Sequence, residues 1–377
     1  MENPRRFFQV ANLSVVARGR DNNLNLIRFV CASAVIVSHS WVLLGAPDPA
    51  QGYLRSCNLG DIAVRSFFFL SGYLILKSGM TGNDAEEFLA ARVLRIFPGL
   101  IVAVLACVFI MGPLASNLSI HNYFLHPGTW RFLHEMVLYR TGESLPGVFE
   151  QGHLLNQVDG VFWTLPVEWT MYVVVLALCL VVRAKTFWGR SRVRTLLITI
   201  AAFALTIQMI PLADRSRVRS CIFYFVFGAI CYLIRKWILL SIPVALLFFG
   251  TDILLIGFHG YDIGTRLFPL ALGYMLITFG FHPAALVRSF HRFGDYSYGL
   301  YIYAFPIQQL NITYIHESWM LFALSYPPSL FAAVLSWHYI EKPCLSIKDR
   351  LKRSRKVVRP KAERVEQELQ SEVGSVP

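Results

Sequence analysis

Residues Asn25–Trp41 read NLIRFVCASAVIVSHSW, an apolar run interrupted by one arginine and one histidine. A run of this length and composition is typical of a helix that crosses a lipid bilayer, which takes about 20 mostly apolar residues. The whole chain of 377 residues has the same character, because 55% of it is hydrophobic and only 15% is charged. A soluble domain carries about 25% charged residues. The sequence therefore predicts an integral membrane protein.

Nine further stretches of this kind follow, so we predict an all-α, polytopic helix bundle with about ten transmembrane helices. The ten predicted spans are 24–45, 60–77, 95–115, 160–182, 195–212, 220–235, 238–256, 266–281, 298–315 and 319–339. With both termini inside, most of the 35 Lys and Arg residues fall on the cytoplasmic side. This asymmetry explains the net charge of +12 without nucleic-acid binding. We divide the chain into a cytoplasmic segment (1–22), a membrane domain (23–345) and a basic cytoplasmic tail (346–377), with a long outer segment at 116–159.

Arg28 and His39 are the ionisable residues of the first span. Eleven residues make about three helical turns, so both side chains project from one face, about 16 Å apart in depth. Ionisable groups inside spans are costly and are functional candidates. The alternative is that Arg28 reaches out to headgroups and that His39 is a satisfied core histidine.

The fourth span carries Glu168 and Tyr172, which are four residues apart and share a helical face with Thr164. Counted from the outer end of its helix, Glu168 reaches a depth comparable to that of His39. A carboxylate beside an imidazole fixes its tautomer and raises its basicity, as a general base requires. Pairing of Glu168 with Arg28 or Arg65 is the alternative.

Ser71 and Gly72 in the second span suit either close helix packing, which we favour, or the approach of a ligand. The inner loop that follows ends with Arg92 and Arg95, which are three residues apart at the cytoplasmic boundary. Guanidinium groups bind phosphates well, although the positive-inside rule alone also explains two arginines there. The segments 293–306 and 338–343 are interpreted on composition as aromatic belts and helix ends.

Taken together, these segments resemble acyltransferase family 3, the membrane enzymes that acylate bacterial surface glycans. The resemblance rests on six motifs that occur in order over about residues 22–345. They are Arg28 and His39 separated by ten residues, Phe67–Gly72, Arg92–Pro98, Leu145–Phe149 with Phe162–Glu168, Ser297–Tyr301, and Glu341–Pro343. Members often have Trp-His where this chain has Tyr303 and Ala304. A role of that histidine cannot be transferred.

The resemblance implies that acyl-CoA, most often acetyl-CoA, is a cytoplasmic co-substrate and that a sugar hydroxyl at the outer face is the acceptor. The acceptor would belong to a polysaccharide, a lipopolysaccharide or a lipid-linked sugar at the bacterial inner membrane. We expect no bound cofactor and no metal. The expected catalytic residues are His39 as general base, Glu168 and Arg28, with an acyl-histidine as an alternative to direct transfer. Arg92, Arg95, Ser71 and Gly72 are expected to bind acyl-CoA, and Trp163, Tyr172, Arg65 and Tyr298 to bind the acceptor.

Three rival functions remain open at this point. A transporter or flippase of lipid-linked glycan precursors would also place charges inside its spans. A structural membrane scaffold would tolerate the loss of Arg28 or His39. A lipid-dependent glycosyltransferase would need an outer acidic pair, for which Glu143 with Glu150 or Asp159 is a weak candidate.

Overall fold

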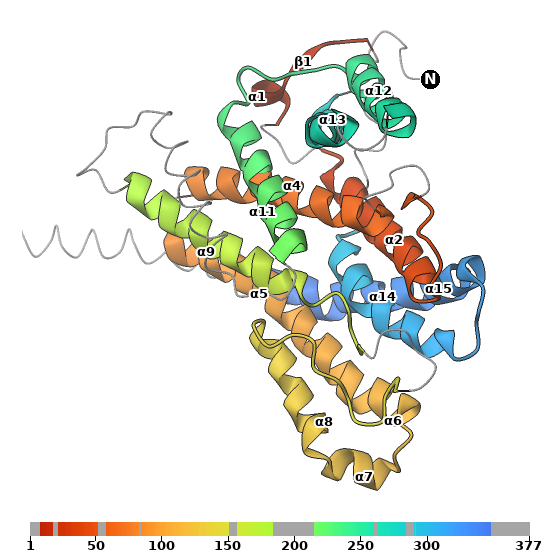
Figure 1. The fold of residues 1–377 in the computed structure, drawn as a ribbon. Coiled ribbons are helices and arrows are strands. Elements are labelled where there is room, and N and C mark those ends of the chain that lie inside the picture. The colour runs from red at the N-terminus through yellow and green to blue at the C-terminus, as the bar shows by residue number, and fades with distance from the viewer. Residues whose placement is uncertain are drawn as a thin grey trace, which may run out of the picture.

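The structure is a computed structural model that describes residues 8–17, 22–51, 58–82, 84–150, 157–183, 215–259, 263–283, 290 and 292–347. Helices dominate this part of the chain (Figure 1). The main helices are α2 (Leu24–Val42), α4 (Leu59–Thr81), α5 (Ala85–Ala106), α9 (Thr164–Arg183), α11 (Arg215–Leu233), α12 (Ile242–His259), α13 (Ile263–Phe281), α14 (Ser297–Ile312) and α15 (Ser318–Ser336). The short elements are β1 (Ala11–Asn12), α1 (Leu13–Val16), the π-helix η2 (Cys107–Met111), α6 (Gly112–Ala115), α7 (Ile120–Leu125), α8 (Pro127–Arg131), the 3₁₀-helix η3 (Phe132–Val137), β2 (Leu239–Leu240) and the π-helix η5 (Trp337–Glu341).

Five helical segments in the described residues are long and apolar enough to cross a membrane. They are Leu24–Val42, Leu59–Thr81, Ala85–Ala115, Thr164–Val181 and Ser318–Ile347. Two shorter apolar helices lie in α12 and α13. Nine of the ten predicted spans coincide with helices, and the stretch 195–212 lies outside the described residues. The helical, membrane-spanning character is confirmed, whereas ten crossings with both termini inside stay a prediction.

The prediction that Arg92 and Arg95 end an inner loop was wrong, because both lie within α5. This helix begins ten residues before the predicted span. Asp84 caps it by accepting a hydrogen bond from the backbone N–H of Glu86, and acidic residues fill its first turn. These start signals stabilise polar turns that hydropathy alone assigns to a loop.

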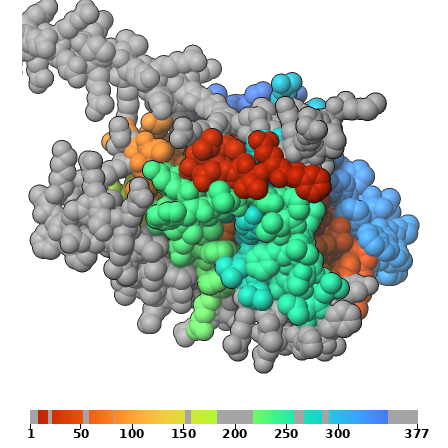
Figure 2. Space-filling model, turned by 90° about the horizontal axis from the view of Figure 1, so that it is seen from above, coloured from red at the N-terminus to blue at the C-terminus, as the bar shows by residue number. Residues whose placement is uncertain are grey.

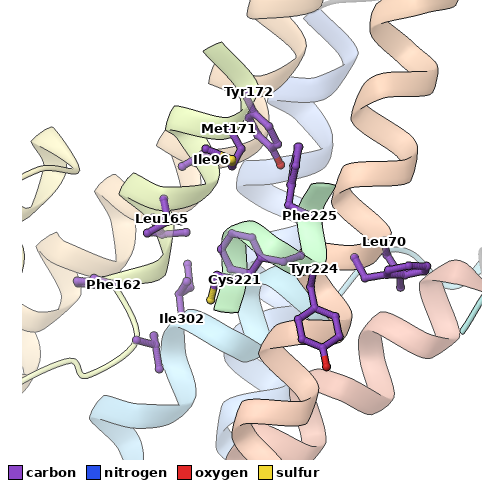
Figure 3. Close-up of a cluster of buried hydrophobic side chains, with 14 of the residues drawn as sticks. Leu70, Ile96, Phe162, Leu165, Met171, Tyr172, Cys221, Tyr224, Phe225 and Ile302 are labelled. Atoms are coloured by element: carbon purple, nitrogen blue, oxygen red, sulfur yellow. The ribbon is translucent and has the colours of Figure 1, made fainter. Parts of the chain in front are cut away.

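The bundle is tightest where α4 crosses α11, and two glycines explain why. A Cβ atom added to Gly72 would lie 1.8 Å from the carbonyl oxygen of Phe225, and one added to Gly228 would lie 1.9 Å from that of Phe69. Each helix therefore lets the other backbone approach directly. The apolar core continues from this crossing to α9 and α14 (Figure 3).

Two smaller features lie at the edges of the bundle. Ala11 and Asn12 in β1 pair antiparallel with β2, and Figure 2 shows this N-terminal segment, in red, lying across the green helices. At another edge of the molecule, α7, α8 and η3 belong to the segment 116–159, which the sequence predicts to be the outer segment (Figure 1). The Tyr123 hydroxyl joins it to the span by donating to the Val108 carbonyl at 2.9 Å.

Candidate active site

A cavity of about 270 Å³ lies between α2, α4, α5, α9 and α14. Its walls are mostly apolar, with contributions from Phe67, Phe68, Leu74, Ile75 and Ile96. Seven of the predicted site residues line it together: Arg28, Ser71, Arg92, Arg95, Glu168, Tyr172 and Tyr298. Most of the residues that the sequence singled out therefore line one pocket, although the sequence assigned them to separate levels of the membrane.

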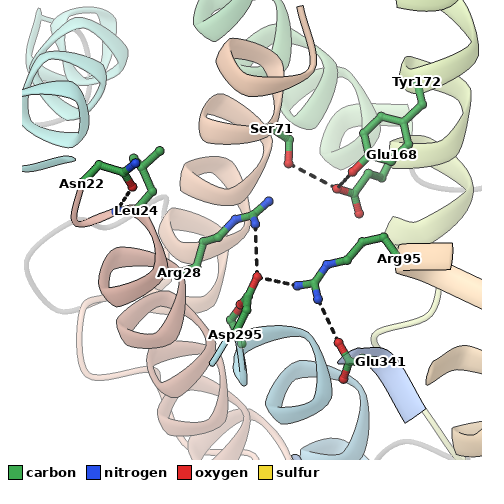
Figure 4. Close-up of polar contacts among 10 residues, drawn as sticks. Asn22, Leu24, Arg28, Ser71, Arg95, Glu168, Tyr172, Asp295 and Glu341 are labelled. Atoms are coloured by element: carbon green, nitrogen blue, oxygen red, sulfur yellow. Dashed lines mark hydrogen bonds and ion pairs between the residues drawn. The ribbon is translucent and has the colours of Figure 1, made fainter. Parts of the chain in front are cut away.

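Arg95 is the centre of a partly buried ion network (Figure 4). Its two Nη atoms lie 2.8 Å from Asp295 Oδ2 and 2.9 Å from Glu341 Oε2. Arg28 shares the same Asp295 oxygen at 3.5 Å. Two carboxylates thus neutralise two cations beside the cavity, and they tie α2 and α5 to the segments that flank α14 and α15.

The positions of these two carboxylates depend on unusual backbone. Gly294, immediately before Asp295, has φ +124°, and a Cβ atom there would lie 2.4 Å from Nε1 of Trp337. This conformation favours glycine. Glu341 ends the π-helical turn η5 and is fully buried, where its Oε1 accepts a hydrogen bond from Ser336 at 3.0 Å. Such π-turns are frequent at functional sites.

Sequence reasoning gave no role to Asp295 and Glu341, although both carboxylates belong to the ion network beside the cavity. Both were present in the segments 293–306 and 338–343, which composition assigned to aromatic belts and helix ends. That interpretation was incomplete, because each segment also carries a carboxylate paired with Arg95, half-buried at Asp295 and fully buried at Glu341. The usable signal was an acidic residue at the edge of an apolar stretch, where an unpaired charge is costly.

Arg92, one turn before Arg95, has a different environment. Its Nη1 donates to the Phe88 carbonyl at 2.9 Å, and its guanidinium stacks 3.8 Å from the centre of the Phe88 ring. Arg92 is only 8% exposed, and its Nε has no hydrogen-bond partner. No ion pair joins it to a carboxylate in the part of the chain that the structure describes. It is a cation that lines the cavity and carries unused hydrogen-bonding capacity.

Glu168 lies at the level of Ser71 in the middle of α4. Its Oε1 accepts hydrogen bonds from the Ser71 hydroxyl, at 3.2 Å, and from the Tyr172 hydroxyl one turn along α9 (Figure 4). The predicted pairing of Glu168 with His39 is not found, since no hydrogen bond or ion pair among the described residues joins them. The depth estimate was too coarse, because α9 begins only at Thr164, so Glu168 stands beside the cavity that Arg28 lines.

His39 lies outside the cavity, eleven residues beyond Arg28 on α2. It is half-buried, with its ring edge-on to Phe305 at a centroid distance of 5.1 Å. Within the described residues, no hydrogen bond to its imidazole is present, so both ring nitrogens remain available. Its catalytic role stays a prediction.

Three other candidates also lie away from the cavity. Arg65 stacks over the Tyr224 ring at 5.8 Å, Trp163 packs against the apolar core, and Gly72 has the helix-packing role that the sequence favoured. Tyr298 lines the cavity, and its hydroxyl donates to the Ile96 carbonyl at 2.7 Å.

The outer segment contains buried carboxylates of its own. Glu135 is 2% exposed, and burial raises the pKa of its carboxyl to about 7, although backbone N–H groups of Glu143 and Gly142 oppose the shift. Burial also raises the pKa of Asp159 well above its ordinary value. No group of three or more His, Cys, Asp or Glu side chains in the described residues is arranged to hold a metal ion.

Comparison with known proteins shows which protein family the chain resembles. A family model described as an acyltransferase domain matches residues 21–338. The chain is 29% identical to an O-acetyl transferase of Shigella phage Sf6 over 340 residues, which cover 87% of this chain and 97% of the relative. It is also 30% identical to Nodulation protein 10 of Rhizobium leguminosarum bv. viciae over 159 residues, 41% of this chain and 43% of that protein. No solved structure matches the chain.

Proposed function

The chain belongs to the acyltransferase family whose domain it matches over residues 21–338, and from this premise we propose that it transfers an acetyl group from cytoplasmic acetyl-CoA to a hydroxyl of a surface glycan. Acetyl is favoured because the phage relative, aligned over nearly its whole length, is named an O-acetyl transferase. We place the enzyme in the bacterial inner membrane, with a polysaccharide, lipopolysaccharide or lipid-linked sugar as acceptor.

The observation that carries the donor assignment is the contrast between Arg92 and Arg95. Arg95 forms ion pairs with two carboxylates, whereas Arg92 lines the same cavity without a carboxylate partner among the described residues. A phosphate oxygen of coenzyme A would complete the hydrogen bonding of Arg92. Arg95 then acts by holding the site together, and Ser71 lines the path of the pantetheine arm. A cavity of about 270 Å³ suits part of the donor and not the whole molecule.

In this mechanism His39 is the general base. It lies about 16 Å along α2 from Arg28, a separation that an extended pantetheine arm can bridge. The imidazole takes the proton of the acceptor hydroxyl as its oxygen attacks the thioester carbonyl carbon. The carbon–sulfur bond breaks, and the leaving thiolate takes up the proton from the imidazolium. Glu168 with Tyr172 provides a polar wall along this path, and Arg28 positions the donor or the ion network.

The test is mass spectrometry of the surface glycan from cells with the gene, without it, and with His39→Ala. We expect the acetyl mass increment to disappear in the deletion and in His39→Ala, with membrane levels of the variant protein unchanged. His316→Ala is the matched control, because His316 is an exposed histidine between α14 and α15. Full acetylation by His39→Ala would refute the mechanism. Glycan missing from the surface or trapped inside the cell would instead support the transporter alternative.

A further inference from the structure

A second cavity, of about 490 Å³, lies in the outer segment. It is bounded by residues 117–118, by α8 with its capping residue His126, and by the turn at 143–150. Its volume falls within the range of about 300–1,000 Å³ that is usual for small-ligand sites. The site described above does not use it.

The wall of this outer cavity is firmly built. Ser116 and Val148 form an isolated antiparallel bridge, and the Asn117 backbone N–H donates to the Gly147 carbonyl at 3.0 Å. The Ser116 hydroxyl donates to the Pro146 carbonyl at 2.8 Å. Gly147 has φ +70°, and a Cβ atom there would lie 2.2 Å from Asn117 Oδ1. These contacts hold the turn against the end of the span, so the cavity does not depend on side chains alone.

The polar side chains around the outer cavity keep much of their hydrogen-bonding capacity. Arg131 is an exposed side chain and Glu143 is a half-buried one, and within the described residues neither side chain makes a hydrogen bond or an ion pair, so both are open to solvent and to a ligand. Glu150 uses one oxygen to accept from a backbone N–H at 3.0 Å, which leaves the other available. His126 accepts a backbone N–H at Nδ1, so Nε2 of its neutral imidazole carries the proton and can donate.

This combination matches a sugar better than an anion or a lipid. Each sugar hydroxyl both donates and accepts, and carboxylates and guanidinium groups supply the complementary charge-assisted hydrogen bonds. Two glutamates against one arginine make the lining net negative, which disfavours a phosphorylated or carboxylated ligand. The polar lining also disfavours an acyl chain.

The outer cavity is too far from the donor cations to hold the reacting hydroxyl. The helical segment from Ala85 to Ala115 is continuous, and the 20 residues from Arg95 to Ala115 span about 30 Å. His39 lies about 16 Å along α2 from Arg28, and Arg28 shares Asp295 with Arg95, so His39 reaches only about half that distance. A sugar in the outer cavity is therefore a different unit from the one that is acylated.

We propose that the outer cavity is an acceptor subsite that binds an uncharged sugar unit of the glycan, away from the hydroxyl that is acylated. This inference rests on the proposed function. It implies that the enzyme prefers a polymer to a single repeat unit, because only the longer chain reaches both positions at once.

The experiment uses the full chain in nanodiscs with radiolabelled acetyl-CoA. The acceptors are fragments of surface polysaccharide from cells that lack the gene, either single repeat units or chains of several repeats. Arg131→Gln should raise KM for long fragments about tenfold or more, the effect of losing about 1.4 kcal/mol, and should abolish the preference for length. Glu143→Gln should act in the same direction. Arg140→Gln is the matched control, because Arg140 is an exposed arginine of the same segment that does not line the cavity.

Equilibrium dialysis of the same long fragments measures the outer cavity without the chemistry. Tighter binding by the wild type than by Arg131→Gln supports the subsite even if no acetyl transfer occurs, and that result would refute only the proposed function. Equal KM and equal binding for long fragments in the wild type and in Arg131→Gln would refute the subsite, whether or not transfer is observed.

Discussion

Arg92 and Arg95 lie one turn apart on α5, and replacing each of them should give a different defect. Arg95→Met removes the cation that both Asp295 and Glu341 share, whereas Arg92→Met removes one that meets no carboxylate among the described residues. Methionine keeps much of the apolar length of the side chain, so the comparison isolates the guanidinium group. We expect Arg95→Met to damage the fold and Arg92→Met to damage donor binding.

The magnitudes follow from what each variant leaves behind. Arg95→Met strands the fully buried Glu341, and breaking a buried pair costs about 3–5 kcal/mol. We therefore expect a loss of about 3–5 kcal/mol in the free energy of unfolding. Arg92→Met forfeits one backbone hydrogen bond and one ring contact, each worth about 1 kcal/mol.

The assays separate stability from donor binding. Equilibrium unfolding in mixed micelles reports the first, and KM for acetyl-CoA with the protein in nanodiscs reports the second. Losing a charge-assisted hydrogen bond of about 1.5–3 kcal/mol should raise KM by about 10- to 100-fold in Arg92→Met. Coenzyme A should stabilise the wild type against unfolding by mass action, and Arg92→Met much less. Equal stability losses in the two variants, or an unchanged KM in Arg92→Met, would refute this division of roles.

Three further predictions concern other parts of the molecule. Gly72→Ala should reduce the yield of folded protein in detergent, measured by size-exclusion chromatography, because its Cβ would overlap the Phe225 carbonyl of α11; a normal yield would contradict the packing. Glu135→Gln should flatten the pH dependence of stability. A folded pKa of about 7 against 4.5 for the free carboxyl means that wild-type stability falls as pH rises from about 4.5 to 7, by about 3 kcal/mol, and is flat above that range. Thermal melts from pH 5 to 8 check this, and parallel curves for both proteins would exclude it. Glu168→Gln retains an acceptor for Tyr172 and should keep the fold while lowering kcat at least tenfold in radiolabelled acetyl transfer, whereas full activity would remove Glu168 from the reaction path.

Hydropathy was sufficient to predict the long apolar helices. The run around Arg28 and the eight other described runs gave helices because satisfying backbone hydrogen bonds in lipid leaves few alternatives. Where the prediction missed a boundary, as at the start of α5, the missing information was a polar cap at Asp84, which hydropathy ignores. This shift of ten residues in the helix start matters for the site, because it places Arg92 and Arg95 on a helix and not in a loop.

The pairing of charges could not be predicted in the same way. Asp295 lies 200 residues from Arg95 in the sequence, and Glu341 lies 246 residues from it. Helical periodicity relates residues within a few turns and carries no information about which helices meet. The depths of His39 and Glu168 along their helices predicted that these two side chains meet. An uncertainty of several residues at a helix start, however, moves a side chain by several ångströms.

The two cavities lie toward opposite ends of one continuous helical segment, and this separation bears on how the substrates meet. A transporter needs a site near the midplane that takes up the whole cargo and opens to each side in turn. Here Arg92 lines a small, mostly apolar cavity, and Arg131 lines a larger, more polar one. The two cavities are separated by about one bilayer thickness along the helical segment. Neither substrate has to cross the membrane if the donor enters from one side and the acceptor from the other. Only the acyl group and its flexible arm then need to reach the level of His39, which is the requirement of a transferase.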